Sequence, residues 1–298
     1  MKAVIIGVNG YLGRNLYQFL MSKEVEVVGV DISENPVDSS IRYQKADITK
    51  INEISGVDLM VDVVYLFSGL TGTWEGFHSY SNFVDVNEKG LLNLLTVHNQ
   101  QMSRARIVFP STRLVYKGVT DKYLNENDET HPKTIYALNK LSCENILNIY
   151  YEVFNINYTV FRICVPYGHL IPGCFSYGTI GFFLNKALNG QNIQLFGDGS
   201  LKRTFTHIED ICFRIWKAVL LKSTENQIYN IGGEVFSLRE LSEIIGEQFN
   251  IGVDYVPWSH EALIVESGDT IFDGSKLDNI VSEPYQHSIS NWVKSIKA

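Results

Sequence analysis

The sequence contains no run of about 18 apolar residues, although 45% of its 298 residues are hydrophobic. A membrane-spanning helix needs about 20 such residues, so we expect none here. The N-terminal stretch MKAVIIGVNG interrupts its short apolar run with glycine and lacks the layout of a signal peptide. We therefore expect a cytoplasmic protein with no membrane contact. Its length allows a large core in one α/β unit or in two joined lobes.

Cysteine and positive charge are both scarce. The four cysteines, at positions 143, 164, 174 and 212, form no CxxC pair and no ligand cluster with the seven histidines. This predicts reduced thiols and no metal site. The formal net charge of −8 would repel the phosphates of a nucleic acid, so no nucleic-acid partner is expected. A small phosphorylated ligand is not excluded, because it needs only one local cation.

Short apolar runs alternate with amphipathic stretches in the first half of the chain. This pattern predicts strands and helices in turn, with strands at Ala3–Ile6, Val25–Val30, Met60–Phe67, Arg106–Phe109 and Tyr158–Ile163 and helices at 12–20 and Leu91–Val97. Such alternation implies right-handed crossovers and a parallel sheet with helices on both faces. We therefore predict an α/β fold with a doubly wound, Rossmann-type sheet.

The pattern changes after about residue 165. Glycines and aromatic residues dominate 167–183, a turn follows at 196–200 (FGDGS), and helices are expected at Thr206–Leu221, Ser237–Phe249 and Ser288–Ile296. We predict a dinucleotide-binding domain at 1–165 and a smaller, mixed α/β substrate lobe at 166–298. Parts of 204–232 are expected to pack back onto the first domain.

A glycine-rich motif, GVNGYLG, directly follows the first expected strand and opens a helix. This is the context in which such a motif binds a dinucleotide. Gly7 permits the tight turn, Gly10 lets backbone N–H groups approach a pyrophosphate, and Gly13 allows close helix–sheet packing. The alternative is an ordinary glycine-rich turn without a ligand.

Acidic residues follow the next two strand-like segments. Asp31, with Ile32, ends the second strand about 20 residues after the glycines, where a carboxylate accepts hydrogen bonds from ribose hydroxyls and repels a 2′-phosphate. This predicts NAD rather than NADP as the cofactor. Asp47, with Ile48, could face the adenine amino group, or it could cap a turn before ITK.

The stretch TIYALNK places Tyr136 and Lys140 one helical turn apart on the same face. One reading is a solvated surface pair. The other is a phenol whose proton is loosened by a neighbouring ammonium group. Tyrosine has an ordinary pKa near 10, so nearby positive charge is needed to make it a base at neutral pH.

Together these features resemble the extended short-chain dehydrogenase/reductase family, which contains the NAD-dependent nucleotide-sugar epimerases and dehydratases. The resemblance covers nearly the whole chain, through the motifs GVNGYLG, YLFSGLTG, VNEKGLLNLL, FPSTRLVYKG, YALNK, FRICVPYG, FGDGSLKRTFTHIEDI and IYNIGGE. It implies bound NAD, a nucleotide-diphosphate-sugar substrate, and a hydride step in which Tyr136 takes the hydroxyl proton.

The resemblance also implies roles for individual residues. The implied catalytic residues are Thr112, Tyr136 and Lys140. The implied cofactor-binding residues are Gly7, Gly10, Tyr11, Leu12, Gly13, Asp31, Ile32, Asp47, Ile48, Phe67, Ser68, Gly69, Asn87, Tyr136 and Lys140. The implied substrate-binding positions are Ser111, Thr112, Arg113, Val165 and Arg203, with Arg203 gripping the diphosphate. His207 and Asp210 are expected to anchor their segment to the first domain.

The resemblance argues against one of the possible reactions and leaves the others open. The family's 4,6-dehydratases carry an Asp-Glu pair after the catalytic threonine, whereas Arg113 and Leu114 stand here, so a dehydratase is not expected. The leading expectation is an epimerase acting at C4 of an NDP-hexose through a transient 4-keto intermediate. The alternatives are a nucleotide-4-keto-sugar reductase and a catalytically silent NAD-binding regulator.

Some positions depart from the family pattern. Glu266 stands where epimerases often carry a second diphosphate-binding arginine, and Val165 replaces an asparagine common in sugar 4-epimerases. These departures point away from the UDP-glucose/UDP-galactose pair. Arg113 could supply the missing positive charge or meet an acidic sugar.

Family members commonly form homodimers through the helix after Asn87 and the helix that carries Tyr136. A homodimer is therefore expected. The apolar residues of these helices could form the interface or belong to the core; they are Leu91, Leu94, Leu95, Leu141, Ile146 and Tyr150.

Overall fold

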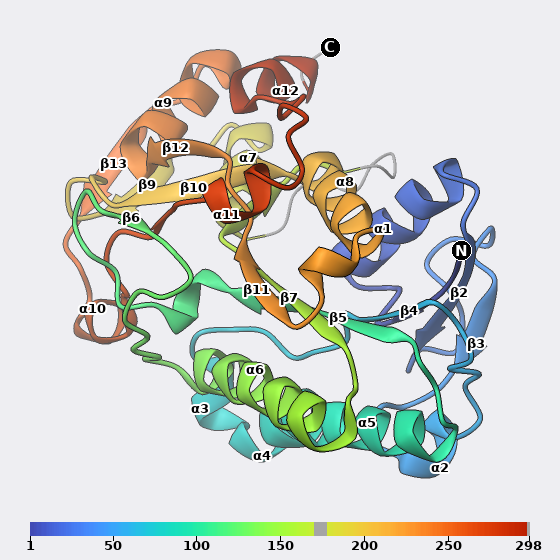
Figure 1. Cartoon of the computed structure of the whole chain (residues 1–298). Coiled ribbons are helices and arrows are strands. Elements are labelled where there is room, and N and C mark those ends of the chain that lie inside the picture. The colour runs from blue at the N-terminus through green and yellow to red at the C-terminus, as the bar shows by residue number, and fades with distance from the viewer. Residues whose placement is uncertain (170–177, 297–298) are drawn as a thin grey trace.

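A seven-stranded parallel sheet forms the centre of the molecule in the computed structural model, which describes residues 1–169 and 178–296 (Figure 1). Its strand order is β11-β7-β5-β4-β1-β2-β3. The strands are β1 (Lys2–Ile6), β2 (Glu26–Asp31), β3 (Tyr43–Lys45), β4 (Val63–Leu66), β5 (Arg106–Thr112), β7 (Tyr158–Ile163) and β11 (Gln227–Asn230). The predicted Rossmann-type fold is confirmed. The chain moves outward from β1 in both directions, so the carboxyl ends of β1 and β4 border the crevice where such sheets bind ligands.

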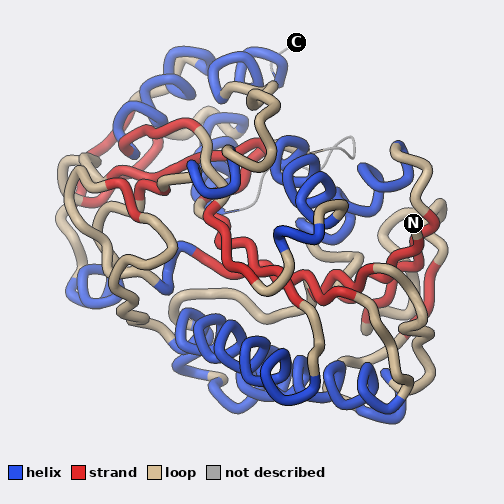
Figure 2. The backbone as a smooth tube through the Cα atoms, in the orientation of Figure 1, coloured by secondary structure: helices blue, strands red, loops and turns tan. Residues whose placement is uncertain are grey.

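Helices cover both faces of this sheet (Figure 2). One face packs against α1 (Tyr11–Ser22) and α8 (Ile208–Val219); the other packs against α2 (Ile51–Ile54), α5 (Gly90–Gln100) and α6 (Ile135–Phe154). Successive residues of β1 alternate between the two resulting cores: Ala3 and Ile5 lie in one, Val4 and Ile6 in the other. Burial on both faces explains why this strand is continuously apolar.

A smaller lobe with its own hydrophobic core follows β7. It contains a three-stranded sheet of β12 (Glu234–Ser237), β10 (Lys202–His207) and β8 (Val165–Tyr167), and the two-stranded pairs β13 (Val253–Val256) with β9 (Ile193–Phe196) and β14 (Ile271–Phe272) with β6 (Tyr123–Leu124). Its helices are α7 (Gly178–Leu188), α9 (Leu238–Phe249), α10 (His260–Val265) and α12 (Ile289–Ile296). The short helix α11 (Ser275–Asp278) packs instead on β11 of the central sheet, with Leu277 in the first core.

The remaining helical elements line the first domain or link the lobes. They are α3 (Glu75–His78), α4 (Tyr80–Val84), the π-helix Asp85–Lys89 and the 3-10 turns Arg113–Val115 and Lys222–Thr224. The chain returns to the first domain after β10, because α8 packs against α1 and β11 extends the central sheet beside β7. None of the helices within 1–169 and 178–296 is long and apolar enough to cross a bilayer.

The observed elements differ from the predicted ones in a few places. Thr206 and His207 were expected to be helical but belong to β10, where they pair with Pro166 and Tyr167 of β8. The predicted strand at 106–109 extends to Thr112. Three of the cysteines, at 143, 164 and 212, are buried free thiols. The fourth, Cys174, and much of the glycine-rich stretch at 167–183 lie outside the described residues.

Candidate active site

The turn between β1 and α1 accepts only glycine at two positions. Gly7 has φ +92°, and a Cβ added to it would lie 2.2 Å from the backbone nitrogen of Ser68. A Cβ on Gly13 would lie 2.1 Å from the carbonyl oxygen of Gly7. The turn is therefore pressed against both β4 and the first turn of α1. Gly10 precedes α1 and offers no side-chain cap, which leaves the positive end of the helix facing the turn.

A cavity of about 330 Å³ opens at the carboxyl ends of β1, β2 and β4. Nine of the residues predicted to bind the cofactor line it: Gly7, Gly10, Asp31, Ile32, Asp47, Ile48, Phe67, Ser68 and Gly69. The hydroxyl of Ser68 is buried without a hydrogen-bond partner among the described residues. An unpaired buried hydroxyl on a cavity wall is costly unless a ligand completes its hydrogen bonds.

The two predicted acidic residues of this cavity have different partners. Asp31 accepts hydrogen bonds from the backbone N–H groups of Asn9 (3.1 Å) and Ser33 (3.3 Å) and stays partly exposed. Asp47 accepts from the backbone N–H (2.9 Å) and the hydroxyl (2.7 Å) of Thr49. Asp47 therefore caps a turn, as one reading of the sequence proposed, and lines the cavity as well.

Four other predicted cofactor residues do not line the cavity. The hydroxyl of Tyr11 donates to the carbonyl of Gly168 (2.7 Å), Leu12 packs against the first core, and Gly13 contacts the glycine turn. Asn87 accepts from the N–H of Leu70 (2.8 Å) and donates to its carbonyl (3.1 Å). Asn87 thereby fixes the loop that follows β4, which forms one side of the cavity.

The helix α6 carries the tyrosine–lysine pair. It begins after Thr134, whose hydroxyl oxygen accepts from the N–H of Ala137 (3.1 Å). The ammonium group of Lys140 is buried, donates to the carbonyl of Pro110 (2.8 Å) and lies 5.9 Å from the centre of the Tyr136 ring. A Cβ added to Gly69 would lie 3.9 Å from the Lys140 Nζ. Lys140 therefore adjoins the cavity at Gly69.

Burial lowers the pKa of Lys140 to about 8, against an ordinary value of 10.5. The nearby Cys143 and Glu144 raise this pKa but do not offset the burial. Lys140 therefore keeps its charge at neutral pH. A buried ammonium group near a phenol favours the charged form of that phenol.

The end of β5 supplies two further predicted residues. Ser111 and Thr112 are both buried, and the Ser111 hydroxyl has no hydrogen-bond partner in the described part of the chain. The Thr112 hydroxyl oxygen accepts from the N–H of Leu114 (3.3 Å) and caps the following 3-10 turn. Lys140 contacts the carbonyl of Pro110, one residue before Ser111, so the end of β5 lies beside the α6 lysine.

An ion pair that sequence reasoning missed holds α6 in place. Arg162 on β7 donates from Nε to one Glu144 oxygen (3.0 Å) and from Nη2 to the other (2.6 Å). Both residues are buried, and Glu144 lies one helical turn after Lys140. A bidentate pair of this kind fixes the orientation of a helix. The arginine was visible in FRICVPYG, but its partner lies 18 residues earlier.

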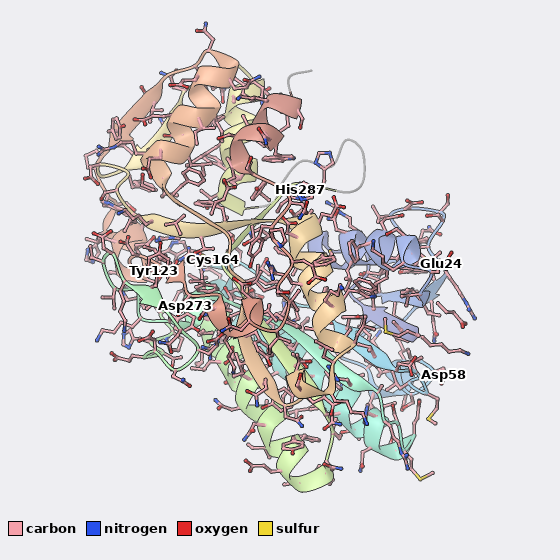
Figure 3. All side chains as sticks on the ribbon, turned by 45° about the horizontal axis from the view of Figure 1, so that its top comes forward. Glu24, Asp58, Tyr123, Cys164, Asp273 and His287 are labelled. Carbon is pink, nitrogen blue, oxygen red and sulfur yellow. The ribbon has the colours of Figure 1, made fainter. Side chains whose placement is uncertain are left out.

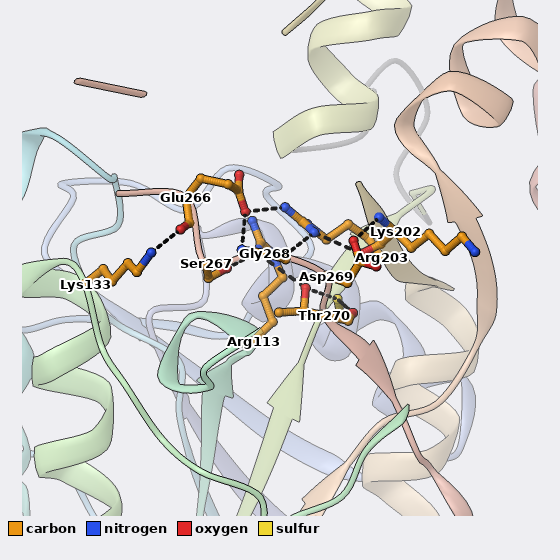
Figure 4. A network of polar contacts seen from close by, with 10 residues as sticks. Arg113, Lys133, Lys202, Arg203, Glu266, Ser267, Gly268, Asp269 and Thr270 are labelled. Carbon is orange, nitrogen blue, oxygen red and sulfur yellow. Dashed lines mark hydrogen bonds and ion pairs between the residues drawn. The ribbon is translucent and has the colours of Figure 1, made fainter. Parts of the chain in front are cut away.

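The predicted substrate residues of the second lobe meet a second network of charges (Figure 4). Arg203 is buried, and its Nη2 lies 2.6 Å from a carboxylate oxygen of Glu266. Arg113 donates from Nη1 to the hydroxyls of Ser267 (3.0 Å) and Thr270 (3.4 Å). Glu266, which stands where epimerases often carry a second diphosphate-binding arginine, thus pairs with Arg203. Val165 lies buried in the core of the second lobe beside Phe205.

A second cavity, of about 390 Å³, borders this network. Its lining includes Lys133, Glu266, Ser267 and Gly268, together with the rings of Phe196 and Trp258, whose centres lie 5.1 Å apart in a stacked arrangement. It therefore combines flat aromatic surface with charges of both signs, since Asp198 also lines it.

A doubly wound sheet whose glycine turn and acidic β2 residue line one cavity, with the lysine of a tyrosine–lysine pair beside it, defines a dinucleotide-dependent enzyme. Residues 3–232 match the family model described as the NAD dependent epimerase/dehydratase family. The chain belongs to this family and is an NAD-dependent enzyme.

Known relatives share the architecture at low sequence identity. The chain is 24% identical over 321 residues to CDP-paratose 2-epimerase of Salmonella typhi, covering 94% of each protein. It is 24% identical over 260 residues to UDP-glucuronate 4-epimerase of Thermodesulfobacterium geofontis, covering 81% of this chain and 79% of the relative. The solved structure of UDP-glucose 4-epimerase of Thermus thermophilus in complex with NAD superposes with a TM-score of 0.86 at 19% identity, covering 99% of this chain and 97% of the other.

Proposed function

We propose that the protein epimerises a nucleotide-diphosphate hexose, at C4, through a transient 4-keto sugar. The observation that carries this proposal is the position of Lys140, which lies beside Gly69 of the cavity wall, contacts the end of β5 at Pro110 and stands 5.9 Å from the centre of the Tyr136 ring. Arg113 and Leu114 follow Thr112, so this segment offers no carboxylate pair for a dehydration. Relatives that epimerise sugar nucleotides support the substrate class.

Each residue has a physical role in this reaction. Tyr136 removes the proton from the sugar hydroxyl, and the Lys140 charge favours the phenolate that can do so. The Lys140 ammonium has further N–H donors for ribose hydroxyls besides the one that contacts Pro110. Thr112 donates a hydrogen bond to the reacting sugar oxygen. Bound NAD supplies the acceptor and donor for the hydride.

The same arrangement supports a proposal about how the substrate sits. The aromatic rings of the second cavity suit the base of a nucleotide, and the adjoining arginines suit anionic oxygens. The cavity at the carboxyl ends of β1, β2 and β4 suits the adenosine half of NAD, with Asp31 facing the ribose hydroxyls. NAD rather than NADP fits this carboxylate, because a 2′-phosphate would be repelled.

We also propose a homodimer. Of the interface residues suggested by the sequence, Leu91, Leu94 and Leu95 are fully buried and belong to the core. Other apolar side chains of the same helices face outward, namely Leu92, Leu138, Ile149 and Val153. An exposed apolar face on adjacent helices is typical of a subunit interface.

The decisive experiment offers the purified protein a panel of UDP-, GDP-, CDP- and dTDP-sugars without added cofactor. Product sugars are identified by NMR, and NAD retained through purification is measured after denaturation. A C4 epimer formed with retained NAD supports the proposal. Inversion at C2 instead of C4 would mean that the enzyme resembles CDP-paratose 2-epimerase in the carbon on which it acts. Steady consumption of added NADH with a 4-keto sugar would instead make the enzyme a reductase.

A further inference from the structure

The contact of Arg113 with Ser267 and Thr270 of the second lobe brings two guanidinium groups and one carboxylate close together (Figure 4). The groups are those of Arg113, Arg203 and Glu266. Lys133 adds a third positive charge at the edge, where its Nζ donates to the carbonyl of Glu266 (2.6 Å). The carboxylate of Asp269 is directed elsewhere, since it accepts from the backbone N–H groups of Lys202 and Asp121.

The hydrogen bonds of Arg203 are already taken. Its Nη1 donates to the carbonyls of Lys202 (2.9 Å) and Gly268 (2.6 Å), and its Nη2 binds Glu266 at 2.6 Å. The same Glu266 oxygen also accepts from the N–H of Gly268 (3.0 Å). With 3% of Arg203 exposed, an incoming anion would have to displace this carboxylate.

Arg113 is partly buried and is compensated less, because it meets the charge of Glu266 without a hydrogen bond to it. Its hydrogen bonds go to two neutral hydroxyls, on Ser267 and Thr270, and within 1–169 and 178–296 it forms no ion pair. Burial, followed by the charge of Arg203, lowers the pKa of Arg113 to about 10, and the opposing charges of Cys164 and Glu266 do not offset this. A guanidinium group remains charged there at neutral pH, and its desolvation is costly unless an anion compensates it.

We propose that Arg113, rather than Arg203, is the primary ligand for an anionic oxygen group of the substrate, and that Glu266 competes with this group by neutralising Arg203. The inference rests on the proposed nucleotide-sugar substrate. Arg113 directly follows Thr112, and its partner Ser267 forms part of the wall of the second cavity. The guanidinium group therefore stands between the reacting hydroxyls and the cavity suited to the nucleotide.

Two parts of a nucleotide sugar could supply the anion. A carboxylate on the sugar ring and a phosphate oxygen of the diphosphate both bind a guanidinium group through paired hydrogen bonds. UDP-glucuronate, UDP-glucose and UDP separate these sources. All three carry the diphosphate, and only the first carries a sugar carboxylate.

Binding of these three compounds by isothermal titration calorimetry tests the proposal on the full-length protein with its retained NAD. The variants are Arg113→Met, Arg113→Lys and Glu266→Gln, with Arg104→Met as a charge-matched control on an exposed site. We expect Arg113→Met to weaken binding about ten-fold to a hundred-fold, because a charge-assisted pair is lost. Arg113→Lys should recover part of the loss. Glu266→Gln should tighten binding, because it frees Arg203.

The outcomes separate cleanly. A loss confined to UDP-glucuronate identifies the sugar carboxylate as the anion, and an equal loss for all three identifies the diphosphate. The proposal is overturned if Arg113→Met binds the three compounds as tightly as Arg104→Met does. It is also overturned if the wild-type protein binds none of them. Glu266→Gln that binds no more tightly overturns the competition by Glu266. Calorimetry reads binding alone, so a protein that binds normally but epimerises nothing would refute the proposed reaction and leave Arg113 in its role.

Discussion

Tyr136 differs from phenylalanine by one oxygen atom, and the proposed reaction depends on that atom. Tyr136→Phe should lower kcat by at least about 100-fold, because proton transfer by a positioned base contributes about that much. Retained NAD and the melting temperature should stay close to those of the wild type. Epimerisation is measured by NMR with the substrate identified in the sugar panel.

Tyr123→Phe serves as the matched control, since Tyr123 is 60% exposed on β6. It should retain full activity. If Tyr136→Phe also kept wild-type activity, the phenol would not be the base, and the enzyme would be closer to the silent NAD-binding regulator considered from the sequence.

Gly13 offers a second test at the scale of one residue. A Cβ at this position meets the Gly7 carbonyl oxygen at 2.1 Å, so Gly13→Ala must push α1 away from the glycine turn. We expect a loss of more than about 3 kcal/mol of stability together with loss of retained NAD. Thermal unfolding and the absorbance of extracted cofactor measure both.

Gly190→Ala is the control for this substitution. Gly190 has φ +66° but no atom within 4 Å of an added Cβ, so only backbone strain of about 1 kcal/mol is expected. If the two variants lost equal stability, close packing at Gly13 would not be the reason for its glycine.

Single residues were predictable where a local pattern determines them. Gly7 and Gly13 were found from spacing alone, because turn geometry and helix packing act within one motif. The pairing of Arg203 with Glu266 was not predictable, since 63 residues separate the two and the fold alone brings them together. The bidentate contact of Arg162 with Glu144 was not predicted for the same reason, since 18 residues separate them in the sequence.

At the scale of an element, the start of α8 carries a pH-dependent contribution to stability. His207 caps this helix by accepting from the N–H of Glu209 (3.2 Å). Its ring stacks on that of His287, with 4.0 Å between the ring centres. His287 is labelled in Figure 3. Burial, followed by the charges of His287 and His169, lowers the pKa of His207 from 6.5 to about 3. In the unfolded chain His207 therefore binds a proton near pH 6.5, whereas in the folded chain it does so only near pH 3.

Protonation thus favours the unfolded state, so this contribution is intact above about pH 6.5 and is lost as the pH falls toward 3. At pH 5 the loss amounts to about 2 kcal/mol. His207→Asn preserves a capping side chain and should flatten the decline in melting temperature between pH 7 and 5. His260→Asn, at an exposed site, should decline as the wild type does. Parallel curves for His207→Asn and wild type would contradict this assignment.

Elements with strong periodicity were predicted well, and their ends less so. Five strands of the central sheet appear where apolar runs placed them, because burial on both faces leaves a clear signal. Thr206 and His207 looked helical because the amphipathic pattern of α8 continues backward through them. Pairing with β8 overrides that local preference, and no single-sequence pattern reveals the partner strand.

For the whole molecule, the outward face of α6 predicts association. Val153 and Ile149 are 65% and 53% exposed, although both are large and apolar. Val153→Glu, alone or with Ile149→Glu, should convert the proposed dimer to a monomer by placing charge in an apolar interface. Light scattering coupled to gel filtration measures the mass.

Leu220→Glu is a suitable control, because Leu220 is 52% exposed at the end of α8, away from α6. It should leave the mass unchanged. A monomeric wild type at micromolar concentration would reject the dimer outright, and a dimer that survives both α6 substitutions would place its interface on another face.

The groups proposed for proton transfer and those proposed for recognition come from different parts of the chain. Thr112, Tyr136 and Lys140 stand on β5 and α6, whereas Arg203, Glu266 and the stacked rings of the second cavity belong to the smaller lobe. A descendant could therefore acquire a new sugar nucleotide by exchanging segments of the smaller lobe while inheriting an unaltered redox centre. Arg113 is the exception, because it is anchored to β5 yet reaches across the boundary, so any such exchange would first have to accommodate its charge.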